Sequence, residues 1–448
     1  MTDFSGKKVL VMGLARSGMA AVKLLTKLGA QVTVSEAKAL SDIKELPELQ
    51  SMGVRVVNQD KEIFEEDYFI AVKNPGINGK LWFVKRLRER GISVITEIEL
   101  AFMVCAPQHF IAITGSNGKT TTSTLVYEII RKQYPDKTLL CGNIGIALCE
   151  MVIEYDLINN GGFYIVLEIS NFQLVDIVNF RPEVAVIINL AADHLDFMGT
   201  EDAYYRSKLR VYENMKDNDT FLYNTDDELI KEYTKEVSVN CDILSYSLVD
   251  SNACLYADDN NVYYNGRVLF PVNDIKVVGR HNVQNVLVGV GAALKCGVSE
   301  ENIRCAVSSF NGVEHRIEFV REKDGVRFYN DSKGTNVDAT VTALKAFSAP
   351  VILLAGGHEK GLDLSPLKPL LKGVKKLIAY GECGERIYNE LTEGAGILVN
   401  DLSEALAEAV KIAVNGDVVL LSPTTSSYDQ YTCFEERGEH FKSLVNSL

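Results

Sequence analysis

The feature that most constrains the fold is a glycine-containing loop between a strand-like run and a segment of helical spacing. Residues 110–113 are apolar, the loop at 114–121 reads Thr-Gly-Ser-Asn-Gly-Lys-Thr-Thr, and the helical pattern follows directly. In such a unit, backbone N–H groups turn toward an anion and the helix N-terminus adds partial positive charge. The unit therefore predicts an α/β fold that holds a phosphate.

The side chains of this loop have the chemistry of a nucleotide site. Lys119 can reach the outer phosphates of a nucleotide, and the Thr120 hydroxyl can ligate Mg²⁺. A P-loop usually has about four residues between its glycines, whereas only Ser-Asn separates Gly115 from Gly118. The predicted ligand is a nucleoside triphosphate. The alternative is a plain strand-to-helix turn with a solvated lysine.

The composition disfavours several classes of partner. The chain has 448 residues, which corresponds to about three domains. Its net charge of −14 opposes nonspecific binding to nucleic acid or to an anionic membrane. No stretch approaches ~18 uncharged apolar residues and the first residues lack a signal peptide, so we expect a cytoplasmic protein. The nine cysteines form no Cys-x-x-Cys pair, which favours reduced thiols over disulfides or zinc.

The first part of the chain alternates strand-like and helix-like patterns. Apolar runs at residues 8–12 and 31–34 flank a segment of helical spacing, which indicates a βαβ unit and a parallel sheet. Gly13 and Gly18 lie where a dinucleotide fingerprint begins and ends, but Ala15 replaces its middle glycine. This replacement disfavours an NAD site.

Polar residues follow two strands of this region. Ser35 and Glu36 end the second strand, where a carboxylate can accept from ribose hydroxyls or a base edge. A solvated glutamate at a strand end is the equal alternative. The run at residues 68–72 leads into a Lys-Asn-Pro-Gly-Ile turn that places Asn74 at the carboxyl edge of the sheet.

The rest of the chain repeats the strand–helix alternation. Buried strand patterns recur at residues 163–167, 184–188, 221–223, 351–357, 376–381 and 417–423. Charged stretches between Asp217 and Asp274 indicate loops and a small peripheral sheet, and the pattern resets after Gly312. We therefore predict three α/β domains: a Rossmann-like domain at 1–97, a P-loop-type ATP-binding domain at 98–312 and a Rossmann-like domain at 313–448.

Two acidic or basic groups follow central strands. Glu168 comes at the end of one strand, where a carboxylate beside a phosphate loop can bind Mg²⁺ that bridges the β- and γ-phosphates. The alternative is a helix-capping acid. His194, between Asp193 and Asp196, follows the next strand and can offer a neutral imidazole to a second Mg²⁺. Taken alone, such a histidine is more often structural.

These motifs resemble those of a known family. The short loop is similar to the nucleotide loop of the Mur ligase and folylpolyglutamate synthase superfamily, and Glu168 opens a heptad, ending in Phe-Gln-Leu, that resembles one group of Mur ligases. In that heptad Asn171 replaces the usual serine. Further segments that resemble the family, in the same order, lie at 193–194, 205–209, 279–285, 314–318, 330–336, 356–361 and 422–434.

The resemblance implies an ATP site with two Mg²⁺ ions. Asn282 would read the adenine, Arg316 would reach the phosphates and Asp331 the ribose. The implied metal ligands are Thr120, Glu168, His194 and Lys208, the last as a carbamate; Lys119, His194 and Lys208 are the implied catalytic residues; the loop contacts to ATP are Gly115, Ser116, Asn117, Gly118, Lys119, Thr120 and Thr121. An unmodified solvated lysine is the alternative at Lys208. N-capping the following helix is an additional or alternative role for Asn282.

The resemblance also implies two substrate sites. The implied contacts to a UDP-sugar are Leu14, Ala15, Ser35, Glu36 and Asn74, with Asn143 and Gln173 facing the sugar and alanine. The family often has aspartate and threonine near residues 35–36 and serine at 74, so the match is looser there. The implied contacts to D-glutamate are Lys333, Thr335, Lys360, Ser427 and Phe434.

The activity implied by this resemblance is ATP-dependent amide formation. D-Glutamate would be added to UDP-N-acetylmuramoyl-L-alanine through an acyl phosphate, in peptidoglycan precursor synthesis for the cell wall. We expect a monomer without nucleic-acid or membrane partners. The alternatives are a sister ligase for another amino acid, a folylpolyglutamate synthase, or a nucleotide-driven switch or transport ATPase without amide chemistry. The N-terminal βαβ pattern and the Phe-Gln-Leu ending disfavour the folylpolyglutamate synthase.

Overall fold

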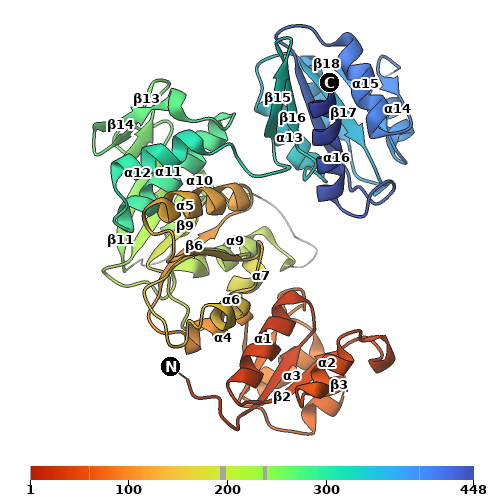
Figure 1. Ribbon diagram of the computed structural model, residues 1–448. Helices are drawn as coiled ribbons and strands as arrows, with labels where there is room; N and C mark the ends of the chain where they lie inside the picture. The colour runs from red at the N-terminus through yellow and green to blue at the C-terminus, as the bar shows by residue number, and fades with distance from the viewer. Residues whose placement is uncertain (1, 60, 192–197, 236–239, 393) are drawn as a thin grey trace. The chain divides into compact units, whose positions relative to one another are not determined.

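The computed structural model describes residues 2–59, 61–191, 198–235, 240–392 and 394–448. Its described strands form three sheets, of five, nine and six strands, with helices packed against them (Figure 1). The predicted α/β class is confirmed, whereas the predicted domain boundaries stay a prediction. The chain divides into two compact units: the first comprises Met1–Asp274 and Gln284–Val307, and the second Ile275–Val283 and Ser308–Leu448. The first unit contains the first two sheets.

The first sheet is parallel and has the strand order β3-β2-β1-β4-β5, which is the start of a doubly wound fold. Its elements are β1 (Lys8–Met12), α1 (Arg16–Lys27), β2 (Gln31–Glu36), η1 (Leu40–Asp42), α2 (Leu46–Ser51), β3 (Arg55–Asn58), η2 (Lys61–Phe64), β4 (Ile70–Lys73), α3 (Trp82–Glu89) and β5 (Ser93–Ile95). A Cβ on Gly18 of α1 would lie 1.9 Å from the carbonyl oxygen of Gly13. Only glycine lets α1 approach the turn after β1 so closely.

The second sheet has the order β14-β13-β12-β11-β10-β9-β6-β8-β7. Its strands are β6 (His109–Thr114), β7 (Thr138–Gly142), β8 (Tyr164–Glu168), β9 (Val184–Ile187), β10 (Thr220–Asn224), β11 (Asp242–Ser247), β12 (Leu255–Ala257), β13 (Asn261–Tyr264) and β14 (Arg267–Pro271). The associated helices are α4 (Glu97–Val104), α5 (Lys119–Gln133), α6 (Leu148–Glu154), α7 (Asn171–Leu174), α9 (Glu201–Leu209), η3 (Arg210–Tyr212), α10 (Glu228–Thr234), η4 (Val272–Asp274), α11 (Arg280–Lys295) and α12 (Glu300–Ser309).

One sequence-based prediction about this sheet is wrong. The described residues between Asp217 and Asp274 form no separate peripheral sheet, because β11 pairs in parallel with β10 and β12 pairs in parallel with β11. The antiparallel strands β13 and β14 then extend the same sheet to its edge. Short edge strands, such as β12 with three residues and β13 with four, carry too weak a hydrophobic pattern to reveal which sheet they join.

The third sheet has the order β15-β16-β20-β17-β18-β19 and is parallel except for the β15–β16 hairpin. Its elements are β15 (Glu318–Lys323), β16 (Val326–Asn330), α13 (Val337–Lys345), β17 (Val351–Gly356), η5 (Ser365–Gly373), β18 (Val374–Tyr380), α14 (Gly384–Thr392), β19 (Ile397–Leu398), α15 (Leu402–Ile412), β20 (Val418–Thr424) and α16 (Phe434–Ser447). Successive residues of β20 enter different core clusters, Val418 on one face and Val419 on the other. This is the pattern of a parallel strand that helices cover on both faces.

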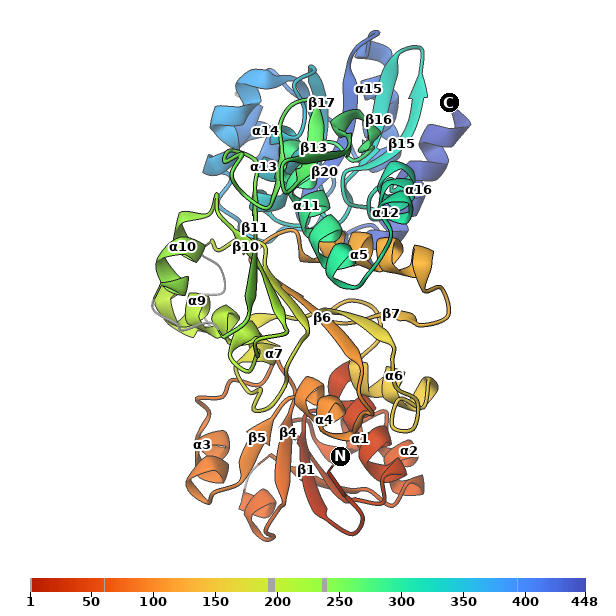
Figure 2. The same cartoon turned by 90° about the vertical axis from the view of Figure 1, so that its left-hand side faces the viewer.

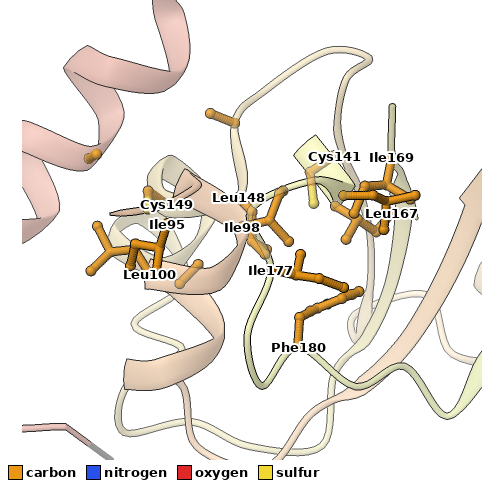
Figure 3. Packing of buried hydrophobic residues seen from close by; sticks show 14 of the residues in the cluster. Ile95, Ile98, Leu100, Cys141, Leu148, Cys149, Leu167, Ile169, Ile177 and Phe180 are labelled. Atoms are coloured by element: carbon orange, nitrogen blue, oxygen red, sulfur yellow. The ribbon is translucent and has the colours of Figure 1, made fainter. Parts of the chain in front are cut away.

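A continuous core joins the first two sheets. α1 lies beside α4 and α6 in both views of the molecule (Figures 1 and 2). The core cluster includes Ile98 of α4, Leu148 of α6 and Leu167 of β8, together with Ile177 and Phe180 from the segment after α7 (Figure 3). Among the described residues, no helix is both long and apolar enough to cross a membrane.

Candidate active site

The glycine loop connects β6 to α5 in the first unit. Gly118 adopts a left-handed conformation, with φ of +80°, and α5 begins at the next residue. The ammonium of Lys119 folds back over the loop and donates to the carbonyl oxygens of Gly115 at 2.8 Å and Ser116 at 2.9 Å. Thr120 and Thr121 follow in the first turn of α5. The predicted strand–loop–helix unit is therefore present, with its lysine poised across the loop.

The segment after β9 supports this loop from the side. The backbone N–H groups of Ser116 and Asn117 donate to the carbonyl and side-chain oxygens of Asn189, at 3.0 and 2.8 Å. The Ser116 hydroxyl donates to the carbonyl oxygen of Ala191 at 2.9 Å. Because these contacts come from a neighbouring strand end, the loop conformation is set by the sheet as well as by its glycines.

Glu168 lies next to the loop at the carboxyl end of β8. It pairs in register with Ile113 of β6, and its side chain is almost fully buried. Oε1 accepts from the amide of Asn143 at 2.8 Å, whereas Oε2 has no hydrogen-bond partner. A buried carboxylate oxygen without a donor fits a Mg²⁺ ligand, since a cation would satisfy it. The helix-capping alternative is wrong, because Ser170 caps α7.

Lys208 also reaches the glycine loop. It belongs to α9, its side chain is 1% exposed, and Nζ donates to the carbonyl oxygen of Gly115 at 2.9 Å. Nζ also lies 4.5 Å from the centroid of the Tyr204 ring. The alternative of a solvated lysine is therefore wrong. His194, with Asp193 and Asp196, lies outside the described residues.

A cavity of about 550 Å³, here called the first-sheet cavity, opens at the carboxyl edge of the first sheet. Four of the five predicted UDP contacts, Leu14, Ala15, Glu36 and Asn74, line it. The carboxylate of Glu36 accepts from the backbone N–H groups of Leu14 at 3.0 Å and Ala37 at 2.9 Å, so it is not a merely solvated strand-end acid. The fifth, Ser35, is fully buried and is not among the residues that line the cavity.

Sequence reasoning missed cations around this cavity. Lys38 and Lys44 line it, and no motif in the sequence marks them. A further missed cation, Arg16 at the start of α1, is not among the residues that line the cavity; it donates to the carbonyl oxygens of Gly145 and, at 3.5 Å, of Asn143. A contact between residues so far apart in the chain has no local sequence signal.

The two residues predicted to face the sugar and alanine have definite partners. Asn143 holds Glu168 through its amide. The side-chain oxygen of Gln173 accepts from the backbone N–H of Ser170 at 2.9 Å and from its hydroxyl at 3.0 Å, which completes the capping box of α7.

The second unit contains the predicted adenine, ribose and phosphate contacts. Asp331 is buried, accepts from the Ser422 hydroxyl at 2.8 Å, and has its pKa raised to about 7, mainly by burial. Arg316 has a buried Nε without a hydrogen-bond partner. Asn282 is the third residue of α11 and donates to the carbonyl oxygen of Val278 at 2.7 Å, so it is not the N-cap of that helix.

The predicted D-glutamate contacts come from four segments of the second unit. Lys360 Nζ lies 3.4 Å from the carbonyl oxygen of Thr335, and Lys333 Nζ lies 5.5 Å from the centroid of the Phe434 ring. Ser427 is buried in the segment that follows β20. β20 is the neighbour of β17 in the sheet, and Lys360 lies in the segment that follows β17. These residues lie around the carboxyl ends of β16, β17 and β20, which are neighbouring strands of the third sheet.

Known families match two parts of the chain. The Mur ligase middle domain matches residues 113–293, and the Mur ligase, glutamate ligase domain matches residues 315–425. The chain belongs to the Mur ligase family. Its glycine loop, Glu168 and Lys208 therefore lie within the family's middle domain, and Asp331 and Lys360 within its glutamate ligase domain.

Relatives in this family match over the full length. The chain is 41% identical over 452 residues to a UDP-N-acetylmuramoylalanine--D-glutamate ligase of Geobacillus kaustophilus, with 99% of this chain and 98% of the relative covered. It is 40% identical to the ligase of the same name from Enterococcus hirae, with 99% and 96% covered.

Solved structures of Mur ligases share the fold. The MurF ligase of Thermotoga maritima in complex with ADP matches with a TM-score of 0.59 at 16% identity, covering 99% of this chain and 96% of that one. The UDP-N-acetylmuramate-alanine ligase MurC of Thermotoga maritima matches with a TM-score of 0.58 at 17% identity, covering 98% and 99%.

Proposed function

We propose that this Mur ligase adds D-glutamate to UDP-N-acetylmuramoyl-L-alanine at the expense of ATP, in peptidoglycan precursor synthesis. The observation that carries the proposal is the end-to-end identity of about two residues in five with ligases named for that reaction. The buried Glu168 carboxylate beside the glycine loop also supports the proposal, because its unpartnered oxygen suits a ligand of the Mg²⁺ that accompanies ATP.

In this proposal the glycine loop and Lys119 hold the triphosphate. The loop N–H groups and the α5 N-terminus face the phosphates, and the Lys119 ammonium exchanges its two carbonyl contacts for phosphate oxygens. Asn282, Arg316 and Asp331 of the second unit would contact the adenine, the phosphates and the ribose. The terminal alanine carboxylate attacks the γ-phosphorus, the bond to ADP breaks, and an acyl phosphate forms.

The metal ligands in this proposal are Thr120 and Glu168 for one Mg²⁺, and His194 and carbamylated Lys208 for a second. Bound there, Mg²⁺ neutralises charge that develops on the transferring phosphoryl group. Carbamylation turns the Lys208 ammonium, a cation that cannot ligate a metal, into an anionic group that can. The burial of Lys208 against the loop supports this role, since a carbamate formed there would lie beside the phosphates.

The second step makes the amide. The amine of D-glutamate attacks the acyl carbon, inorganic phosphate leaves, and the amine loses a proton. Lys360 and Ser427 would bind carboxylate oxygens of D-glutamate, with Lys333, Thr335 and Phe434 around them. The site would select an amino acid whose side chain carries a carboxylate, because a basic side chain of the substrate would place its positive charge against that of Lys360.

The UDP moiety of the substrate would occupy the first-sheet cavity. Leu14, Ala15, Glu36 and Asn74 line this cavity, and Lys38 and Lys44 add positive charge that suits a diphosphate. Asn143 and Gln173, near Glu168, would face the sugar and alanine. We further propose a monomer that acts in the cytoplasm, where ATP and D-glutamate are available. Light scattering of the purified protein tests the monomer.

A panel of amino acids tests the proposed function. Phosphate release is measured with ATP, Mg²⁺ and UDP-N-acetylmuramoyl-L-alanine against D-glutamate, L-glutamate, L-alanine and L-lysine. We expect turnover with D-glutamate and background rates with the others. Equal rates with L-lysine would reject the assignment in favour of a sister ligase. Phosphate release without any amino acid would favour a simple nucleotide hydrolase.

A further inference from the structure

A buried ion pair that the proposed chemistry does not use connects two parts of the first unit. Lys73, the last residue of β4, has a side chain that is 1% exposed. Its Nζ lies 3.2 Å from Oδ2 of Asp176, whose side chain is 6% exposed. Lys73 belongs to the first sheet, whereas Asp176 follows α7 beside the second sheet. The ion pair therefore adds an electrostatic connection between the two sheets, which the apolar core also joins.

The Lys73 side of the pair shapes the first-sheet cavity. Lys73 directly precedes the turn that contains Asn74 and Ile77, and both of these residues line the cavity. Besides its contact with Asp176, the Lys73 ammonium donates to the carbonyl oxygen of Ile77 at 2.9 Å. The same cation thus fixes the cavity wall and reaches the second sheet.

The Asp176 side of the pair lies in the segment that follows the proposed metal ligand Glu168 in the chain. Asp176 comes two residues after α7, whose capping box contains Gln173, and β8 before it ends at Glu168. Its Oδ1 accepts from Arg88 of α3 at 2.6 Å. The next residue, Ile177, is buried in the core that joins the sheets (Figure 3).

Backbone contacts hold the Asp176 segment on both sides. Arg210, two residues after Lys208, donates to the carbonyl oxygens of Leu174 at 3.1 Å and Ile177 at 2.8 Å. The carboxylate of Glu99 accepts from three successive backbone N–H groups, those of residues 178–180, at 2.8 to 2.9 Å. Because its backbone is held by these hydrogen bonds, we expect this segment to keep its position relative to the second sheet.

The energetics of the pair indicate a role in geometry. Burial lowers the pKa of Lys73, and Asp176 opposes that effect. A buried ion pair adds little net stability compared with an apolar pair of the same volume, although removing one partner is costly. Its location between the cavity wall and the segment that follows Glu168 in the chain is therefore explained by a role in holding these two parts in place.

We propose that Lys73 and Asp176 are positioning residues that hold the first-sheet cavity at a fixed distance from Glu168, so that one UDP-sugar substrate spans both. The proposal rests on the proposed function, because that substrate has uridine diphosphate at one end and the reacting carboxylate at the other. The number of bonds between these two ends is constant, so a shift of the cavity relative to Glu168 misplaces one of them.

Calorimetric titration of two ligands tests this role. UDP occupies only the cavity, whereas UDP-N-acetylmuramoyl-L-alanine has to reach both ends. We expect the ratio of Kd for UDP-N-acetylmuramoyl-L-alanine to Kd for UDP to rise about 10-fold in Asp176→Asn, which corresponds to one displaced set of polar contacts. The matched control is Arg86→Met on α3, because Arg86 is exposed and pairs only with Glu89 at 3.3 Å among the ion pairs of the described residues.

A second variant covers the case in which Asp176→Asn does not fold. Lys73→Met/Asp176→Asn removes both charges, leaves no unpaired buried lysine, and is expected to show the same rise in the ratio. A merely structural pair would weaken both ligands equally or neither. An unchanged ratio in the folded variants overturns the proposal.

The titration separates this inference from the proposed function. It contains neither ATP nor D-glutamate, so a wild-type enzyme that failed with D-glutamate would reject the assigned reaction and leave the ratio measurable. Wild-type protein that did not bind UDP-N-acetylmuramoyl-L-alanine at all would overturn both. In turnover assays of the active enzyme, we expect KM for the UDP-sugar to rise in Asp176→Asn while KM for ATP stays within about 2-fold of wild type.

Discussion

The glycine-loop region and the D-glutamate region differ in how their residues are held. In the first, Lys119 and Lys208 both donate to the carbonyl oxygen of Gly115, and Glu168 lies on the adjacent strand. In the second, Lys360 is exposed and touches only the backbone oxygen of Thr335 among the described contacts. The first region is organised by its own side chains, whereas the second consists of loops that share a sheet edge.

This difference indicates how function divides between the two regions. Phosphoryl transfer gains from charges that are already in place when the transition state forms. Recognition of an amino acid needs fewer fixed contacts and can use side chains that settle on the ligand. We therefore expect substitutions in the glycine-loop region to lower kcat, and those in the D-glutamate region to raise KM.

Loss of Lys119 or of the Glu168 charge is expected to have the largest effect. Lys119→Ala and Glu168→Gln should each lower kcat by about 100- to 1,000-fold, because each removes a charge that acts on the transferring phosphoryl group. Steady-state phosphate release measures this, and thermal unfolding should show intact folding. Lys132→Ala, an exposed lysine on the same helix, is the control. Near wild-type turnover in either variant would contradict the proposed roles.

Lys208→Ala should lower kcat by about 100-fold, and a small carboxylate should restore part of the loss. Acetate can fill the space of the missing side chain and offer oxygens to Mg²⁺, whereas acetamide has the same size and no charge. Rates are compared at high concentrations of each, with Lys216→Ala, an exposed lysine, as control. If acetate and acetamide act alike, the carbamate is rejected.

Lys360→Ala should raise KM for D-glutamate by about 10- to 100-fold and change kcat less, because it removes one charge-assisted contact to the substrate. Initial rates over a range of D-glutamate concentrations give both constants. Lys368→Ala, an exposed lysine of η5, should leave both unchanged. A fall in kcat without a rise in KM would mean that the D-glutamate region is as rigid as the glycine loop.

The smallest expected effect concerns the stability of the second unit. The pKa of Asp331 is about 7 in the folded protein, against about 3.9 in an unfolded chain. Its contribution to stability is therefore complete below about pH 4 and is lost as the pH rises through 7. We expect the unfolding temperature to fall by a few degrees between about pH 5 and pH 8, and Asp331→Asn to reduce that fall. Calorimetry at several pH values measures it; Asp338→Asn, an exposed acid, should keep the wild-type slope.

Contiguous motifs could be predicted from the sequence because their residues are neighbours in the chain. The glycine loop, the βαβ unit around Gly13 and Gly18, and the position of Glu168 at a strand end all depend on local patterns, and the structure contains each of them. The family resemblance added Lys208, whose burial against Gly115 no periodicity indicates.

Contacts between distant segments could not be predicted in this way. The strands after β10 join the central sheet through pairings that weak edge patterns do not specify. Ser35 is fully buried and is not among the residues that line the first-sheet cavity. Because all residues from Val32 to Ser35 are buried, the pattern of β2 does not reveal which side chain reaches the cavity. The Lys73–Asp176 pair joins residues more than a hundred positions apart, and burial of a lysine has no signature in the sequence.

The capping box of α7 limits what Gln173 can offer a ligand. Its side-chain oxygen already accepts two hydrogen bonds from Ser170, so the amide N–H groups are the part that remains for recognition. Gln173 can therefore donate to a carbonyl or carboxylate oxygen of a ligand. Its side-chain oxygen has no free lone pair to accept a hydrogen bond from a hydroxyl group. Replacing Gln173 by glutamate would keep an oxygen for the capping box but would present a carboxylate acceptor to the substrate in place of the amide donor.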